Sequence, residues 1–186
     1  MNFPTKHDDL NAVHTILLAI GEDPEREGLE DTPLRVCKSH HEMFSGYRKD
    51  PKDVMKTFKE GSCDEMVLLK GIEFISFCEH HMLPFWGTAD IAYIPNGRII
   101  GVSKLARLLE IYSKRLQVQE RLTTQITSAL DEHLKPKGSA CVIKASHFCM
   151  MARGVKKQAS TMITSSLTGV LREGQARLEF LHLIKD

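Results

Sequence analysis

The sequence has no long apolar run and no excess of charge of one sign, and each absence excludes a class of protein. Among its 186 residues, no uninterrupted apolar stretch approaches the roughly 20 residues of a membrane span. The first ten residues, MNFPTKHDDL, lack the apolar core of a secretory signal. The 25 Lys+Arg balance 24 Asp+Glu to a net charge of +1, which gives no reason to expect nucleic acid or an anionic membrane as a partner.

Cysteine is scarce and odd in number: the five cysteines occupy positions 37, 63, 78, 141 and 149. A sparse, odd set without a secretory signal predicts reduced thiols and a cytoplasmic location. A disulfide between Cys78 and Cys149 is therefore the weakest explanation for that pair. A hydrophobic content of 42% is enough for a sizeable core, as in one domain with at most a small appendage.

The first part of the chain predicts two helices joined by a polar loop. Apolar residues recur at helical spacing over residues 8–20. After an acidic loop, Pro33 at a first helical position predicts a second helix over residues 32–45. We expect residues 1–62 to form an N-terminal helical arm and residues 63–186 to form the main domain.

The main domain alternates strand and helix patterns. Short β-prone runs predict strands over residues 66–77, and an Asn-Gly turn at residues 96–97 predicts a hairpin between the flanking strands. Two apolar series out of phase predict two helices that meet near Gln117, with Glu120 just past the joint at a position whose helical phase points inward. Residues 141–149 alternate as a strand, and further segments predict a strand over 160–171 and a closing helix over 175–184. This order predicts an α+β fold, an antiparallel sheet with helices on one face.

Metal-capable side chains gather in two distant segments. Cys78 and His81 are three residues apart just after a predicted strand, whereas His147 and Cys149 share one face of another predicted strand. Short-spaced thiolate and imidazole pairs from two segments are typical of zinc. A closed site of all four residues would be a structural staple, and an open site of two cysteines and one histidine would leave a position for water. Spacing alone does not distinguish the closed site from the open one. A domain large enough to fold without a metal favours the open site.

Basic residues form a second candidate cluster. Lys104 and Arg107 share a face at the start of a predicted helix, where free backbone N–H groups also attract anions. Arg35 and Lys38 are one helical turn apart, and Arg153 follows the second metal-capable segment. Any single pair is most simply a solvated charged face. Together they indicate a ligand that carries phosphate as well as a group exposed to the metal.

The sequence closely resembles the GTP cyclohydrolase I family through four ordered motifs: CEHH, GVSKLAR, QVQERLT and SHFCMMARG. The resemblance extends from about residue 22 to the last predicted helix. It implies hydrolysis of GTP at purine C8, release of formate and formation of 7,8-dihydroneopterin triphosphate, which opens folate and pterin synthesis.

The resemblance also implies a role for each matching residue. The zinc ligands are Cys78, His81 and Cys149. The catalytic residues are His80, which would protonate purine N7, His147, which would relay protons, and Ser103, which would assist the later rearrangement. The guanine contacts are Gln119 and Glu120. The triphosphate contacts are Arg35, Lys38, Lys104, Arg107 and Arg153.

The fold implied by the resemblance is the tunnelling fold, in which ββααββ units assemble side by side into a barrel, preceded here by the helical pair. The implied assembly is a homodecamer of two pentamers with active sites between subunits. Two other interpretations stay open: a nitrile reductase on the same fold that uses a cysteine thiolate and NADPH, and a non-catalytic module with a closed zinc site. The CEHH and HFC motifs disfavour the reductase.

Overall fold

The computed structural model describes residues 7–61 and 63–185, and the chain separates into two compact units that divide between Ser45 and Gly46. The sequence-based expectation is a division between residues 62 and 63. Residue 62, like residues 1–6 of the expected arm, lies outside the described residues. The two units are described separately below.

The N-terminal unit contains the two predicted helices, α1 (His7–Ala19) and α2 (Thr32–Met43). They pack against each other, with Leu17 of α1 and Cys37 of α2 buried. Burial raises the pKa of the Cys37 thiol, and the nearby Asp9 carboxylate raises it further. Cys37 is thus a neutral, apolar filler of this small interface.

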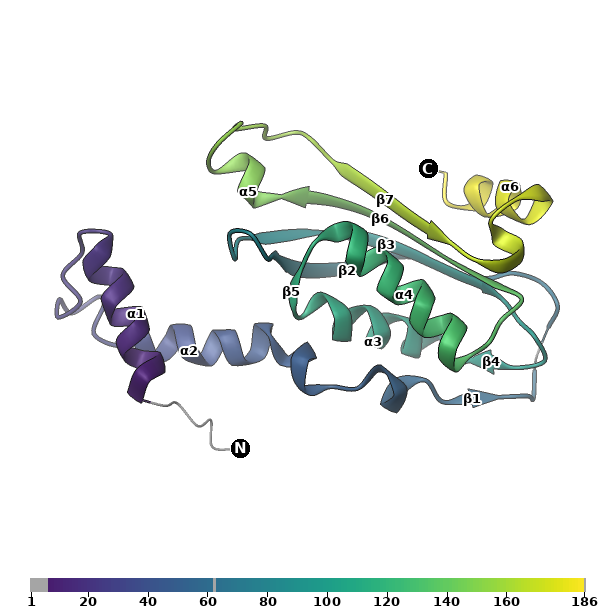
Figure 1. The fold of residues 1–186 in the computed structure, drawn as a ribbon, viewed down its shortest axis with the longest axis horizontal. Helices are drawn as coiled ribbons and strands as arrows, with labels where there is room; N and C mark the ends of the chain where they lie inside the picture. The colour runs from purple at the N-terminus through teal and green to yellow at the C-terminus, as the bar shows by residue number, and fades with distance from the viewer. Residues whose placement is uncertain (1–6, 62, 186) are drawn as a thin grey trace. The chain divides into compact units, whose positions relative to one another are not determined.

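The second unit is built on one five-stranded sheet (Figure 1). Its strands, in spatial order, are β5 (Leu116–Gln117), β2 (Val67–Cys78), β3 (Pro84–Ile94), β6 (Gly138–His147) and β7 (Met162–Leu167). All neighbours are antiparallel except β5, which runs parallel to the end of β2. A bulge at Gly71, whose φ is +71°, interrupts β2, and the buried Asp90 carboxylate accepts the Gly71 N–H at 2.8 Å.

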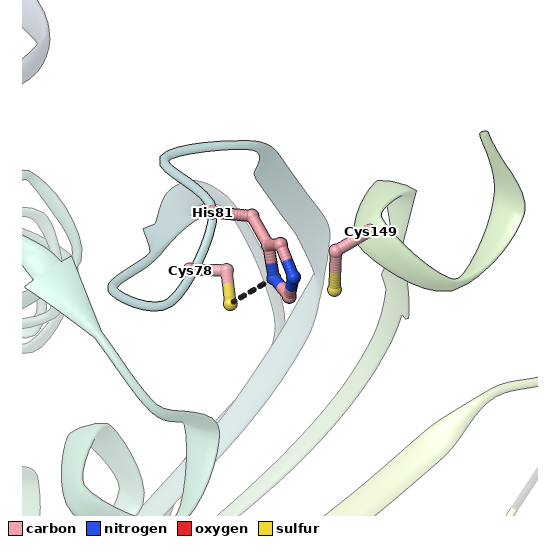
Figure 2. A group of neighbouring side chains, drawn as sticks. All are labelled: Cys78, His81 and Cys149. Atoms are coloured by element: carbon pink, nitrogen blue, oxygen red, sulfur yellow. Dashed lines mark hydrogen bonds between the residues drawn. The ribbon is translucent and has the colours of Figure 1, made fainter. Parts of the chain in front are cut away.

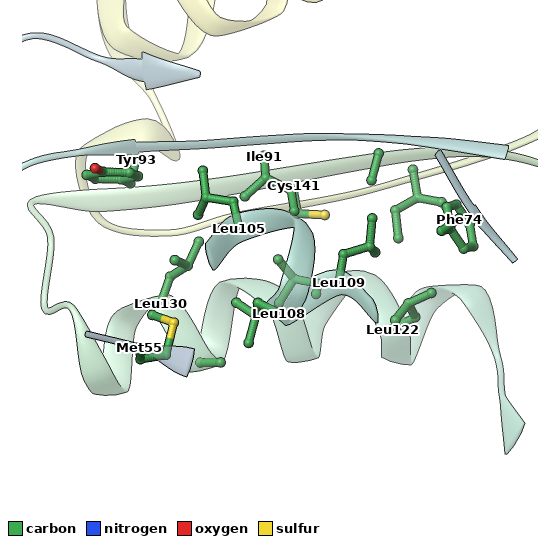
Figure 3. Close-up of a cluster of buried hydrophobic side chains, with 14 of the residues drawn as sticks. Met55, Phe74, Ile91, Tyr93, Leu105, Leu108, Leu109, Leu122, Leu130 and Cys141 are labelled. Carbon is green, nitrogen blue, oxygen red and sulfur yellow. The ribbon is translucent and has the colours of Figure 1, made fainter. Parts of the chain in front are cut away.

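Two helices, α3 (Val102–Ser113) and α4 (Gln119–His133), cover one face of this sheet. Their apolar stripes meet the inward-facing residues of β2, β3 and β6 (Figure 3). Leu108, Leu122 and Leu130 are fully buried there, and each contributes roughly 1.5–3 kcal/mol. A charged residue at Leu108 would disrupt this layer, since it would have no partner in the apolar core.

The closing helix α6 (Gly174–Leu183) packs on the other face of the sheet. Phe180 and Leu171 form a second buried cluster there with Ala92, Ala140 and Val142, which alternate with the residues of the main core. The predicted α+β fold, an antiparallel sheet backed by helices, is confirmed and is consistent with the tunnelling fold. No helix among the described residues is both long and apolar enough to cross a lipid bilayer.

The predicted hairpin at the Asn-Gly turn is wrong. The turn forms, with Gly97 at φ +70°, but the following strand β4 (Ile99–Ile100) pairs with β1 (Thr57–Phe58) in a separate two-stranded sheet. Strand β3 cannot accept β4 because β2 and β6 already occupy both of its edges. The Tyr93 hydroxyl accepts the Ile100 N–H at 3.2 Å and holds β4 beneath the sheet instead.

The predicted break between the two main helices is confirmed. Leu116 and Gln117 leave the helical path and form β5, and Gln117 pairs with Cys78 at the end of β2. The phase of α4 differs from the expected one: Gln119 is 1% exposed, whereas Glu120 lies on the exposed side. Because α4 begins anew after β5, the spacing of buried residues in α3 does not predict which residues of α4 face inward.

Candidate metal centre and substrate site

The first donor segment is the tight turn between β2 and β3. The Cys78 N–H donates to the Leu83 carbonyl at 2.8 Å, and the Met82 N–H donates to the Cys78 carbonyl at 2.8 Å. Met82 adopts a left-handed φ of 55°, which costs a non-glycine residue on the order of 1 kcal/mol. This closed turn leaves Cys78 buried and His81 exposed on its surface.

The second donor segment differs from its prediction. Strand β6 ends at His147, and Cys149 lies on a four-residue helix, α5 (Phe148–Met151). Cys149 therefore does not share a strand face with His147, as the alternating pattern of residues 141–149 suggests. The turn into α5 separates the two side chains into different surroundings.

Cys78, His81 and Cys149 converge across these two segments (Figure 2). One ligand atom from each lies within 4.8 Å of the others, and Cys78 Sγ is 4.0 Å from His81 Nδ1. Donors around a tetrahedral zinc ion are roughly 3.5–3.8 Å apart. Burial raises the pKa of the Cys149 thiol, and the Cys78 sulfur raises it further, so two thiolates here need a cation between them.

His147 is held away from this cluster by two other contacts. Its Nε2 lies 2.8 Å from Gln119 Oε1, and its ring stacks on Phe85 with 4.6 Å between centroids and 3° between planes. Burial lowers the pKa of the His147 imidazole, and the Glu120 carboxylate opposes that shift. The arrangement suits a histidine that exchanges protons, because a partly buried neutral ring is available as a base.

The other residues of the CEHH turn have separate contacts. His80 is exposed, with its Nδ1 3.8 Å from Cys78 Sγ. Glu79 forms a short ion pair with Arg121 of α4, and the Arg121 hydrogen bond is the main cause of a lowered pKa of the Glu79 carboxyl. Arg121 also donates to the Leu116 carbonyl at 3.1 Å. The ion pair thus ties the turn to the first turn of α4.

Ser103 and Lys104 lie at the opposite end of β2 from Cys78. Tyr93 pairs with Val67 at the start of β2, and its hydroxyl binds Ile100 just before α3 begins at Val102. β2 has 12 residues, so its two ends are roughly 35 Å apart along the strand. One chain therefore does not bring Ser103 and Lys104 to the cysteine–histidine cluster.

The remaining basic candidates are exposed and dispersed. Arg107 lines a groove of about 780 Å³ between α3 and the β2–β3 strands, together with Glu110 and Trp86. Arg153 lies beside the metal-capable cluster, where its Nη1 donates to His81 Nε2 at 3.1 Å. In the N-terminal unit, Arg35 pairs with Asp31 at 2.9 Å, and Lys38 is exposed on the same helix.

Several site residues are absent from the sequence-based set. Phe85, Arg121 and Thr164 contact His147, Glu79 and Gln119 respectively. The pairing of Phe85 with His147 is a cross-strand neighbour relation, and strand register is not readable from one sequence. Arg121 had a weak signal, since it belongs to the QVQERLT motif.

Known proteins resemble this chain over most of its length. The sequence profile of the GTP cyclohydrolase I family matches residues 10–185. Curated relatives named GTP cyclohydrolase 1 include those of Wolinella succinogenes, 51% identical over 93% of this chain and 94% of the relative, and Dehalococcoides mccartyi, 53% identical over 94% of each. The relative from Rickettsia felis is 51% identical over 98% of both chains. The chain therefore belongs to the GTP cyclohydrolase I family.

Proposed function

We propose that this chain is a zinc-dependent enzyme that hydrolyses GTP at purine C8, releases formate and forms 7,8-dihydroneopterin triphosphate, the first step of folate and pterin synthesis. The observation that carries the proposal is the convergence of Cys78, His81 and Cys149 from two distant segments. Family membership supports the GTP cyclohydrolase activity itself.

The donor set fits zinc with one open position. Two thiolates and one imidazole are preferred zinc ligands, and three protein ligands are the usual number in a catalytic site. His147, which would complete a closed site, has its Nε2 on Gln119 instead. Zinc held there would supply a Lewis acid that activates water for addition to C8.

The two histidines outside the ligand set carry the proton transfers. His80, exposed beside the cluster, donates a proton to N7 and so makes C8 electrophilic. His147 relays protons as the C8–N9 bond breaks and the resulting formamide is hydrolysed. Its stacked, partly buried ring keeps these transfers away from bulk water.

Glu120 recognises the guanine edge. Its carboxylate accepts from the purine N1–H and from the exocyclic amine, two donors that adenine does not present together. Glu120 is exposed in the first turn of α4 and close enough to His147 to influence its pKa. An adenine nucleotide would leave the carboxylate unpaired, so the site discriminates strongly against ATP.

The basic side chains proposed to bind the triphosphate do not lie together within a single chain. Arg153 lies beside the metal ligands, whereas Lys104 and Arg107 are on α3. We therefore propose that a second copy supplies α3, with Ser103, to each site, as in the decamer of two pentamers that the family resemblance implies. Arg35 and Lys38 complete the proposed set of phosphate contacts.

The cysteines support a reducing compartment. All five are free, and Cys78 and Cys149 are needed as thiolates. Disulfides are rare where glutathione and thioredoxin keep thiols reduced, so we place the reaction in the cytoplasm.

The test is GTP turnover by the purified chain with and without a chelator. Formate is measured directly, and the pterin is measured by fluorescence after oxidation. Loss of both signals with chelator and their return with zinc is the expected result. Full activity after metal removal would reject the zinc-dependent mechanism, and a metal-bound chain that releases no formate would indicate a binding module instead.

A further inference from the structure

We propose that Gln119 is a positioning residue that holds the His147 ring in place and fixes its tautomer, with the hydrogen on Nε2 and the lone pair on Nδ1. The kinetic part of this inference rests on the proposed function. The structural part, the tautomer, does not depend on which reaction the chain catalyses.

The orientation of the Gln119 amide is set by its surroundings. Its Nε2 is within hydrogen-bond distance of three oxygens: the Ile143 carbonyl at 3.0 Å, the Met162 carbonyl at 3.1 Å and Thr164 Oγ1 at 3.1 Å. The two carbonyls can only accept. A flipped amide would direct Oε1 at them and leave buried acceptors facing each other, so Nε2 faces the sheet and Oε1 faces His147.

The hydroxyl contacts agree with this orientation. Thr123 Oγ1 donates to the Gln119 carbonyl at 2.7 Å, so its remaining contact with Thr164 Oγ1 at 2.6 Å must be as an acceptor. Thr164 therefore donates to Thr123 and accepts from Gln119 Nε2. The hydrogen bonds run in one direction, from the Gln119 amide through two threonines back to the Gln119 backbone, and every donor has an acceptor.

This circuit determines the proton on His147. Gln119 Oε1 is an acceptor, so the His147 Nε2 at 2.8 Å must carry a hydrogen. In the neutral ring Nδ1 then holds the lone pair. Stacking on Phe85 opposes rotation of the ring about its Cβ–Cγ bond, which would turn Nε2 away from Gln119 Oε1. The ring of His147 is thus held in one orientation, with its lone pair on Nδ1.

The competing role is the guanine contact that the family resemblance implies for Gln119. Both Gln119 amide protons have acceptors within the protein, and the side chain is buried at 1% exposure. A guanine contact through the amide N–H groups would break the sheet interactions, and a second donor to Oε1 would have to reach a side chain that is almost fully buried. The two roles predict different kinetics, since lost substrate binding raises KM, whereas a misplaced base lowers kcat.

The tautomer is measured by nitrogen NMR on the full chain with ¹⁵N-labelled histidine rings. The His147 signal is identified by its loss in His147→Asn, and spectra are recorded about two pH units above the ordinary histidine pKa of ~6.5. We expect a directly bonded proton at Nε2 and none at Nδ1. A neutral ring protonated at Nδ1 would overturn the proposal, and this measurement requires no change at Gln119.

Kinetics then test the positioning role. Gln119→Met should lower kcat by on the order of 10- to 100-fold with little change in the KM for GTP. Adding Gln119→Met to His147→Asn should lower kcat no further, because Gln119 acts only through His147. The control is Thr127→Val, which removes a hydrogen bond to Ser166 one helical turn further along the same stripe of α4 and should leave kcat unchanged.

The outcomes separate the alternatives. A KM that rises with kcat unchanged would reject positioning in favour of a guanine contact. An equal loss of kcat in Thr127→Val would show that any lost hydrogen bond between α4 and β7 lowers kcat by destabilising the fold. That result would also reject the proposal. If the native chain releases no formate from GTP, the proposed function fails while the tautomer result still decides the structural claim.

Discussion

The two segments that supply the site are built in opposite ways. The turn after β2 is held mainly by its own backbone hydrogen bonds and presents His80 and His81 to solvent. The end of β6 instead places His147 in a partly buried position between Phe85 and Gln119. The turn therefore presents its histidines to solvent, whereas the His147 ring is held by neighbours from two other elements of the fold.

The largest effect should come from the metal ligands, where the two segments meet. Cys149→Ser should abolish bound zinc and formate release together, because one donor of three is lost. Metal content and turnover are measured on the same sample. Cys63→Ser is the matched control, since Cys63 is an exposed thiol outside the cluster. Turnover retained without Cys149 would remove it from the ligand set.

Guanine recognition should give the next largest effect. Glu120→Gln should raise the KM for GTP by about 100-fold, because a hydrogen-bonded charge contributes roughly 1.5–3 kcal/mol. Steady-state kinetics with GTP provide the measurement. Glu132→Gln, at the exposed far end of α4, should change nothing. A KM for the Glu120 variant equal to the native value would exclude this carboxylate from the guanine contact.

Phosphate binding is expected to produce a smaller and selective loss. Arg153→Ala should reduce kcat/KM for GTP by about tenfold and affect guanosine much less, because the arginine then has no phosphate partner. The ratio of the two substrates is the informative quantity. Equal losses would show that Arg153 acts through its hydrogen bond to His81 rather than through phosphate.

The stacking contact that holds the His147 ring can be removed without changing a polar side chain. Phe85→Leu removes the ring on which His147 stacks and should lower kcat severalfold, with roughly 1–2 kcal/mol lost from unfolding stability. Phe74→Leu changes a neighbouring core ring and should cost similar stability but no kcat. Parallel thermal unfolding and kinetic data distinguish the two. Matching kcat losses would assign the effect to the core as a whole.

The Glu79–Arg121 ion pair in the turn after β2 should have the smallest effect, a change in thermal stability that depends on pH. Arg121 lowers the pKa of the Glu79 carboxyl, so the ion pair contributes stability above the unfolded pKa of about 4.3 and loses it as pH falls through the lower folded value. Arg121→Met should lower Tm by about 1–2 °C at neutral pH. The Tm difference from the native chain should shrink as Glu79 is protonated in acid, leaving the part due to the hydrogen bond from Arg121 to the Leu116 carbonyl, which does not depend on pH. A Tm difference of the same size at neutral and acid pH would exclude the ion pair with Glu79 as a contributor.

The sequence allows the prediction of features that depend on local pattern. The break near Gln117, the helices on both sides of it and the sheet were all readable from periodicity and turn residues. The partner of β4 was not, because it depends on which strand edges are already occupied. Cys149 was placed on a strand because alternation continues through Phe148, although the chain turns at His147.

The three metal-capable residues of the candidate site were predictable as a group, but the surroundings of the site were not. The spacing of Cys78 and His81 indicated a shared metal, and their donors do lie together with that of Cys149. Nothing in the sequence indicated that the Gln119 amide would be bound on both sides, because its partners come from β6 and β7. Side chains whose role depends on three separate strands or helices are not identifiable from spacing.

The separation of α3's first turn from the metal-capable turn has a genetic consequence under the shared-site proposal. A chain without Lys104 would still offer intact metal ligands, and a chain without His81 would still offer an intact lysine. Mixed assemblies of the two defective forms would then contain some undamaged sites. Complementation between alleles that are each inactive alone would follow directly from the length of β2.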